Sequence, residues 1–198
     1  NLKSADVPKY IQVIESNAFL VCNITTDLNL DKYITLGSGA LKGFMGKVYI
    51  GFDVPSSYFS GCGFAEVVLG DGVTSIGASA FSYCEKMSKL TLSESVATIE
   101  NNAFSDCLSL TSVTIPSNVT YIGDKVFLDC TALKTAYIKS TTPPYMGERV
   151  FQWFSGGATY NDIMTRIYVP ASDDDSIIDA YKAATGWRSY KNYIYEAL

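Results

Sequence analysis

The chain of 198 residues contains no histidine. This absence removes the commonest general base, the commonest zinc ligand and every catalytic triad that is built on imidazole. Nucleophile motifs are missing as well, because "GASAF" from Gly77 lacks the last glycine of a Gly-x-Ser-x-Gly elbow and no Ser-x-x-Lys occurs. The glycine-rich stretches from Gly37 and Gly43 do not have phosphate-loop spacing. The sequence therefore gives no support for an enzyme, and it indicates no metal and no cofactor.

Long apolar runs and clusters of basic charge are absent too. No apolar stretch approaches the roughly 18 residues that span a bilayer, so we predict a soluble chain without a membrane span. With 15 Lys and Arg against 20 Asp and Glu, and no basic block, the chain lacks the electrostatic footprint of a nucleic-acid-binding protein. The stretch from Asn1 shows no charged-then-apolar leader, so the sequence itself does not indicate export. A hydrophobic fraction of 47% provides enough apolar surface for a folded domain.

What the chain does contain is a repeat. The nine residues "IESNAFLVC" from Ile14 return as "IENNAFSDC" from Ile99. Alignment on the Phe-x-x-Cys tetrapeptide places all five cysteines in one register, with the ladder residues Phe19, Phe59, Phe81, Phe104, Phe127, Cys22, Cys62, Cys84, Cys107 and Cys130. The last four cysteines are 22, 23 and 23 residues apart, and the 40-residue gap after the first leaves room for nearly two units, one of them without its cysteine. Such a period is typical of a solenoid.

Within each unit the apolar residues fall at the same offsets. In the clearest unit Val113 and Ile115 alternate with polar Ser112 and Thr114, which indicates a short strand with one face inward. A second short extended stretch and a tight turn follow. Stacked coils would share one core and would place equivalent residues ~4.8 Å apart. We therefore predict a solenoid of mostly short β-strands with coils of about 23 residues.

The repeat pattern resembles a known family. L-x-x-V-x-I-P-x-x-V-x-x-I-G-x-x-x-F-x-x-C, read from Leu110 to Cys130, is similar to the BspA-type leucine-rich repeat, strongly over residues 60–140 and recognisably over residues 10–30. The tail, with a Tyr-Val-Pro strand, a short helix and a Trp, is similar to the way these arrays end. The resemblance implies a single leucine-rich repeat domain over residues 1–198, with irregular N-terminal coils (1–57), regular repeats (58–139), and an irregular last coil and C-terminal capping helix (140–198).

The resemblance also implies a role. Such domains are found mainly on surface or secreted proteins of anaerobic bacteria, so we expect a non-catalytic module at the cell surface or outside the cell that binds an extracellular protein or glycan in adhesion. Two alternatives stay open. The chain could be a structural spacer or assembly module of a larger surface protein, or, more remotely, a hydrolase.

Two segments depart from the family pattern. Between Asp31 and Ser57 the register is lost, and we interpret this segment as a degenerate or looped-out repeat. From Gln152 to Thr165 an insertion appears where the family has a compact turn. Its aromatic residues, Trp153, Phe154 and Tyr160, could cover the end of the core or form an exposed contact loop.

Cysteines and carboxylates are the next candidates. An odd number of cysteines at one inward position indicates buried free thiols rather than disulfides. Asp173, Asp174 and Asp175 lack the alternating spacing of a calcium loop and precede an apolar stripe over Ser176–Thr185, so we expect them to cap a helix. Asp106 and Asp129 share one repeat position. They are either two solvated turn residues or a carboxylate pair that hydrolysis or a cation would need.

The outward positions of the main strands are the remaining candidate. A strand face with small hydroxyls that ends in tyrosines is a plausible platform for a protein strand or a glycan, although such residues are also good strand formers. The predicted binding residues are Lys89, Thr91, Ser112, Thr114, Thr135, Tyr137, Arg166 and Tyr168. Recognition is expected near the two tyrosines.

Overall fold

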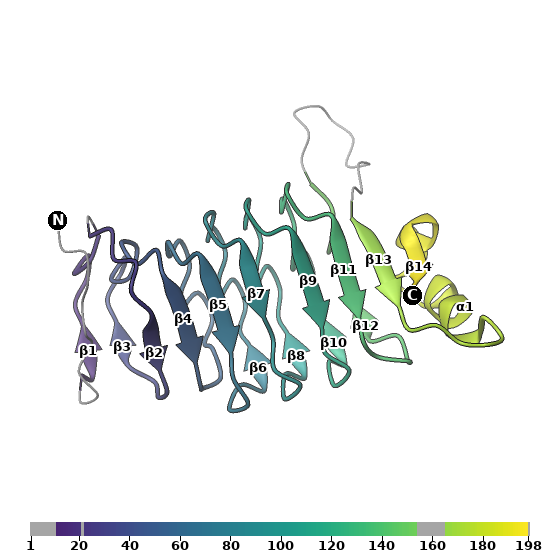
Figure 1. Ribbon diagram of the computed structural model, residues 1–198, viewed down its shortest axis with the longest axis horizontal. Helices are drawn as coiled ribbons and strands as arrows, with labels where there is room; N and C mark the ends of the chain where they lie inside the picture. Colours follow the sequence, from purple (N-terminus) through teal and green to yellow (C-terminus); the bar gives the residue numbers. More distant parts are fainter. Residues whose placement is uncertain (1–10, 21, 154–164, 198) are drawn as a thin grey trace.

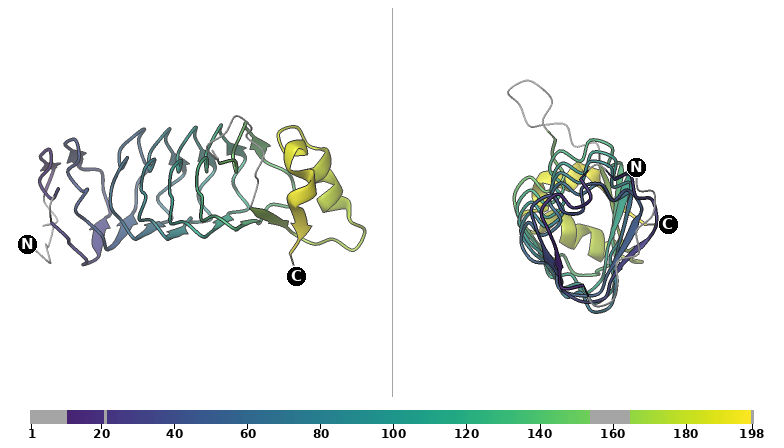
Figure 2. Two further views of the ribbon diagram at one scale, coloured as in Figure 1. Left: turned by 90° about the horizontal axis from the view of Figure 1, so that it is seen from above. Right: turned by 90° about the vertical axis from the view of Figure 1, so that its left-hand side faces the viewer.

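The computed structural model describes residues 11–20, 22–153 and 165–197. The chain forms a parallel β-solenoid of about seven coils, closed at its C-terminal end by a short helix (Figures 1 and 2). The predicted fold class is therefore confirmed. Viewed along its long axis, the coils superimpose as a ring (Figure 2), and their buried apolar side chains form one core cluster.

The longer strands lie on one side of the solenoid, and their outward surface is called the main face below. They are β2 (Leu28–Leu30), β4 (Lys47–Ile50), β5 (Glu66–Leu69), β7 (Lys89–Thr91), β9 (Ser112–Ile115), β11 (Thr135–Ile138), β13 (Arg166–Val169) and β14 (Ile194–Glu196). They form two parallel sheets in the orders β2-β4-β5-β7 and β9-β11-β13-β14. Inward and outward residues alternate along these strands, as in β9, where Val113 and Ile115 are buried and Ser112 and Thr114 are exposed.

Two-residue strands form a second face. They are β1 (Val13–Ile14), β3 (Thr35–Leu36), β6 (Ser75–Ile76), β8 (Thr98–Ile99), β10 (Tyr121–Ile122) and β12 (Tyr145–Met146). β1 pairs with β3, and β6, β8, β10 and β12 form a separate parallel sheet. The hydrogen-bond ladder of this face is thus divided after the second coil.

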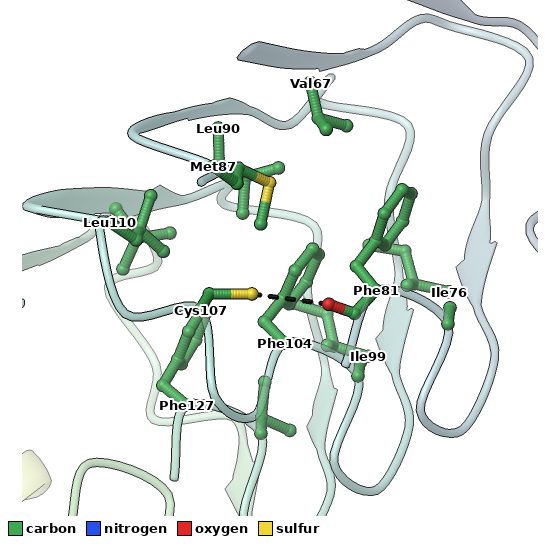
Figure 3. Packing of buried hydrophobic residues seen from close by; sticks show 14 of the residues in the cluster. Val67, Ile76, Phe81, Met87, Leu90, Ile99, Phe104, Cys107, Leu110 and Phe127 are labelled. Carbon is green, nitrogen blue, oxygen red and sulfur yellow. Dashed lines mark hydrogen bonds between the residues drawn. The ribbon is translucent and has the colours of Figure 1, made fainter. Parts of the chain in front are cut away.

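A ladder of phenylalanine rings runs through the core. Phe59, Phe81, Phe104, Phe127 and Phe151 stack in order, with ring centroids 5.3, 5.3, 5.5 and 5.6 Å apart. Figure 3 shows three of these rings in line. Phe151 was not among the predicted ladder residues, although "GERVF" repeats the spacing of "GDKVF" one coil earlier.

The ladder differs at its N-terminal end. Phe19 meets Phe44 edge to face, with 5.1 Å between ring centroids, and it is not part of the parallel stack. Leu41 and Phe44 occupy in the second coil the places that Phe and Cys take in the other coils, and both are buried. The core positions of the Phe-x-x-Cys pattern are therefore also filled in the second coil, although by other residue types.

The segment from Asp31 to Ser57 forms a coil whose residues depart from the repeat pattern, so of the two interpretations the degenerate repeat is supported and the looped-out repeat was wrong. It contains β3, a tight turn and β4, and Val48 and Ile50 of β4 pair with β5 in register. Leu36 and Val54, which occupy equivalent positions, are 18 residues apart, whereas Val54 and Ile76 are 22 apart. This coil is therefore shorter than the next one, and most of the missing residues are missing from the connection after β4. There the Asp53 carboxylate accepts the backbone N–H groups of Thr74 (2.6 Å) and Ser75 (2.8 Å).

All five cysteines are free, as predicted. Four are buried, and Cys22 is half-buried. The thiols of Cys84 and Cys107 donate to the backbone carbonyls of Phe59 (3.2 Å) and Phe81 (3.3 Å) of the preceding coil, and the second of these contacts is drawn in Figure 3. The thiol column therefore satisfies backbone acceptors that face the core.

The C-terminal cap consists of helix α1 (Ser176–Ala183), a 3-10 helix (Arg188–Tyr193) and β14. Three buried aromatic side chains attach it to the last coil. Tyr181 Oη donates to the Ser140 carbonyl at 2.8 Å, Trp187 Nε1 donates to the Pro144 carbonyl at 2.8 Å, and Tyr190 Oη accepts the Phe151 N–H at 3.3 Å. These bonds pair backbone groups that would otherwise end the solenoid unsatisfied.

Helix α1 begins and ends close to the predicted positions. The Asp174 carboxylate accepts the Ser176 N–H at 3.1 Å, and hydrogen bonds from Ser176 lower the Asp174 pKa. Asp175 is left-handed (φ 57°) and makes no side-chain cap, so one carboxylate of the three binds a helix N–H. The helix ends two residues before the predicted Thr185, because Ala184 turns to extended backbone. Gly186 follows with φ +85°.

Candidate ligand-binding face

The predicted binding residues line the main face in two columns. The strand register places Thr135 beside Ser112 and Arg166, and Tyr137 beside Thr114 and Tyr168. On the neighbouring sheet the same columns continue with Lys89 and Thr91. All eight predicted side chains point outward and are exposed or half-buried. β7 and β9 belong to separate sheets, so the columns cross a break in hydrogen bonding that the repeat pattern did not indicate.

Three tyrosines stack at the C-terminal end of the main face. The Tyr137 and Tyr168 rings are 5.1 Å apart at an interplanar angle of 16°, and Tyr168 and Tyr195 are 5.9 Å apart at 38°. Tyr137 and Tyr195 remain 42% and 43% exposed. Because each ring sits on a paired strand, the stack is a rigid, amphipathic surface, and the Tyr195 hydroxyl at its end donates to the Asn192 carbonyl at 3.5 Å.

Tyr195 was not among the predicted binding residues. It belongs to β14, which returns after the cap to pair with β13, with Tyr168 opposite Tyr195. The alternation Tyr193-Ile194-Tyr195 is a strand signal, but its pairing partner lies across a helix and could not be read from the repeat register.

The N-terminal half of the main face is charged. Glu66 bridges two lysines, with its Oε1 3.2 Å from Lys47 Nζ and 3.0 Å from Lys89 Nζ. Lys47 Nζ also lies 4.5 Å from the centroid of the Tyr49 ring. The hydrogen bond from Lys89, followed by that from Lys47, lowers the Glu66 pKa. Lys47 and Tyr49 were not among the predicted binding residues, because their segment lacks a clear repeat register in the sequence.

Asp106 and Asp129 lie in equivalent left-handed turns, with φ 59° and 58°. Burial, and then the nearby charge of Asp129, raise the Asp106 pKa. The two carboxylates are therefore close enough to interact, as stacking predicts, but both are half-buried turn residues. Among the described residues, no group of three or more His, Cys, Asp or Glu side chains is arranged to hold a metal ion.

A second aromatic pair lies away from the main face. Tyr121 and Tyr145 stack with centroids 5.0 Å apart and rings nearly parallel. Tyr145, which is 58% exposed, borders a hollow of about 570 Å³ between the last coil and the cap, together with Gln152, Ser189 and other residues. Of the insertion from Gln152, Trp153 is half-buried, while Phe154 and Tyr160 lie outside the described residues.

The stacked parallel coils, each with one large apolar residue at the same turn position, define a leucine-rich repeat solenoid. Six copies of the BspA type leucine-rich repeat region match residues 1–46 and 53–159. The chain belongs to this family. Leucine-rich repeat proteins are typically non-catalytic.

Two solved structures are similar to the chain. A leucine-rich repeat protein of T. pallidum is 21% identical over 52% of this chain and 68% of its own, with a TM-score of 0.39. A leucine-rich cell surface protein from Faecalibacterium prausnitzii A2-165 is 25% identical over 72% of this chain, with a TM-score of 0.45. The match spans 47% of that protein's length. No curated protein matches the chain.

In residues 11–20, 22–153 and 165–197, no helix has the length and apolarity that crossing a membrane requires.

Proposed function

We propose that the chain is a non-catalytic binding module of a cell-surface or extracellular protein, and that it recognises a protein or glycan ligand in adhesion. The observation that carries the proposal is the stack of Tyr137, Tyr168 and Tyr195 on the main face. The surface location rests on the family to which the chain belongs.

Exposed stacked tyrosines are suited to recognition. Tyrosine offers a large contact area with few rotatable bonds, so little side-chain entropy is lost when a ligand covers it. The neighbouring hydroxyls of Thr114 and Thr135 can donate and accept hydrogen bonds. A flat aromatic surface bordered by hydroxyls fits both the apolar face of a sugar ring and an extended peptide.

The test is binding of the folded chain to an immobilised panel of extracellular matrix proteins and glycans. A saturable partner is expected, and the double variant Tyr137→Ala/Tyr168→Ala should bind it at least about tenfold more weakly, because buried aromatic contacts dominate such interfaces. The matched control is Tyr121→Ala/Tyr145→Ala, which removes an equivalent stack from the other face.

The outcomes separate the candidates. Equal loss in both double variants, or no loss in the first, would contradict recognition on the main face. A blank panel with a folded chain favours the second candidate, a structural spacer or assembly module. The elongated stack of coils in Figure 1 supports that candidate, because such a rod sets a fixed distance between its ends.

A further inference from the structure

The backbone ladder on the turn side of the coils is interrupted at one place among the described residues. In the first coil and in the third to sixth coils, the N–H of the first left-handed turn residue donates to a carbonyl of the next coil, as from Asn17 to Ser38 (3.0 Å) and from Asn102 to Asp124 (2.9 Å). The N–H of the phenylalanine two positions later also donates to a carbonyl of the next coil, as from Phe104 to Val126 (2.9 Å). These bonds are missing between the second coil (residues 35–50) and the third coil (residues 54–69).

On both walls of the interruption, backbone groups have no hydrogen-bond partner in the part of the chain that the structure describes. In the second coil these are the N–H groups of Gly39, Leu41 and Gly43, for which no acceptor is found among the described residues. In the third coil the carbonyls of Ser56, Tyr58 and Ser60, which the register would place opposite them, receive no N–H from that part of the chain. One wall therefore offers donors and the other offers acceptors.

Proline and chain length explain the interruption. Pro55 occupies the position at which Gly37, Gly77 and Gly123 donate to the preceding coil, at 2.7 to 2.8 Å. Proline has no N–H to donate. The connection that leads to it is also short, so Val54 pairs with Ile76 of the fourth coil and not with β3. On the main face, in contrast, β2, β4 and β5 remain paired.

The result is a slot open on one side of the solenoid. A cavity of about 440 Å³ lies between residues 36–42 of the second coil and Ser56, Ser57, Tyr58, Ser60 and Cys62 of the third. Tyr58 spans the two coils, because its hydroxyl donates to the Ile34 carbonyl and its ring lies 5.1 Å from that of Tyr33. Among the described lining residues Lys42 is the one with a charge, so the slot favours an anionic group.

We propose that this slot binds a short extended peptide segment that carries an acidic residue. Its carbonyls would accept the N–H groups of Gly39 and Leu41, its N–H groups would donate to the third-coil carbonyls, and its carboxylate would pair with Lys42. Addition of an extended peptide to unpaired backbone groups at a sheet edge is an established mode of recognition, and here the unpaired groups lie in the turns of two neighbouring coils. Here it satisfies backbone groups on two walls at once, and backbone N–H and C=O groups are obligatory hydrogen-bonding groups.

The occupant follows from the chemistry of the walls. A peptide presents both N–H donors and carbonyl acceptors along its backbone, as the two walls require, whereas a glycan has no backbone amides. The slot uses none of the main-face residues, so the inference is independent of the function proposed above.

Amide hydrogen exchange of the free protein tests the geometry. The N–H groups of Gly39 and Leu41 should exchange at least about tenfold faster than the equivalent groups of Ser79 and Phe81, which are bonded to the next coil at 2.9 and 2.8 Å. Equal protection would mean that the ladder is closed there, and the proposal would fail.

Binding is tested with a library of N-acetylated, C-amidated tetrapeptides, pooled by charge and followed by the amide NMR resonances of the intact chain. Acidic pools should shift Gly39, Leu41 and Gly43 and slow their exchange. N-methylation of the best peptide at its pairing amides should weaken it at least tenfold, since this removes the donors but no charge. Lys42→Gln should weaken acidic peptides severalfold, whereas Lys134→Gln, at an exposed lysine on another coil, should not.

Two results would overturn the proposal. One is a library in which no pool shifts these three amides. The other is an N-methylated peptide that binds as well as its parent, because binding would then not use the backbone ladder.

Discussion

Truncation of Phe104 to alanine measures how strongly the ring ladder holds the solenoid together. Phe104 is fully buried and stacks between Phe81 and Phe127 at 5.3 and 5.5 Å. Its removal therefore leaves a cavity bounded by two rings from different coils. Those rings are fixed by their own coil backbones, so the cavity cannot collapse easily.

The expected loss is about 3–5 kcal/mol of unfolding free energy, the range for a buried Phe→Ala change. We expect the upper half of this range, since two stacked aromatic contacts, each worth about 0.5–1.5 kcal/mol beyond burial, are lost together. For a chain of this size the change corresponds to a lowering of Tm by roughly 6–20 °C.

Urea and thermal unfolding, followed by circular dichroism, provide the measurement. Phe104→Leu is the matched control, because it keeps most of the apolar volume and should cost less than half as much. Leu108→Ala, at a 39% exposed side chain on the same coil, should change stability by less than about 1 kcal/mol. If Phe104→Ala costs no more than Leu108→Ala, burial and stacking of the Phe104 ring do not stabilise the solenoid.

Two further predictions concern the thiols and Asp53. Burial raises the pKa of Cys62 to about 12 and raises that of Cys84, so a thiol reagent at pH 8 should modify half-buried Cys22 much faster than these two cysteines. After unfolding without reductant, five thiols should titrate. Fewer than five would indicate a disulfide. Burial acts to raise the Asp53 pKa, but the hydrogen bonds from Thr74 and Ser75 outweigh the effect of burial, so the Asp53 pKa is lowered overall. Because the folded pKa lies below the unfolded value of about 3.9, this carboxylate stabilises the fold above that pH and loses its effect as pH falls through the folded pKa. The free energy of urea unfolding should therefore differ more between wild type and Asp53→Asn at pH 6 than at pH 2.5, with wild type the more stable. The same difference at both pH values would contradict this prediction.

The fold could be predicted because the repeat is visible in residue types. Phe-x-x-Cys marks the turn of most coils, and stacking converts equal sequence positions into neighbours in space. The prediction failed where a coil keeps the geometry but changes the residues. Leu41 and Phe44 fill the ring and thiol places of the second coil, so a search for Phe and Cys could not find it.

The candidate binding face could be predicted in part. Alternation along each strand identified the outward residues, and the register then placed Tyr137 beside Tyr168. Tyr195 could not be placed, because its strand pairs only after the chain has formed the cap. The slot was invisible for a different reason. It depends on bonds between coils, which sequence patterns within a coil do not describe.

In a solenoid, departures from the repeat carry more information than the repeat itself. A regular coil gives its neighbours the same ladder of donors and acceptors, and it leaves nothing for a ligand except side chains. Pro55 is an exception, because it has no N–H and so removes one backbone donor. The short connection before it separates three further donor–acceptor pairs of the backbone. The continuous pairing of β4 with β2 and β5 keeps the two parts of the rod joined at this point. The chain can therefore offer unpaired backbone groups on one side without losing its core, and this combination is what a peptide-binding slot requires.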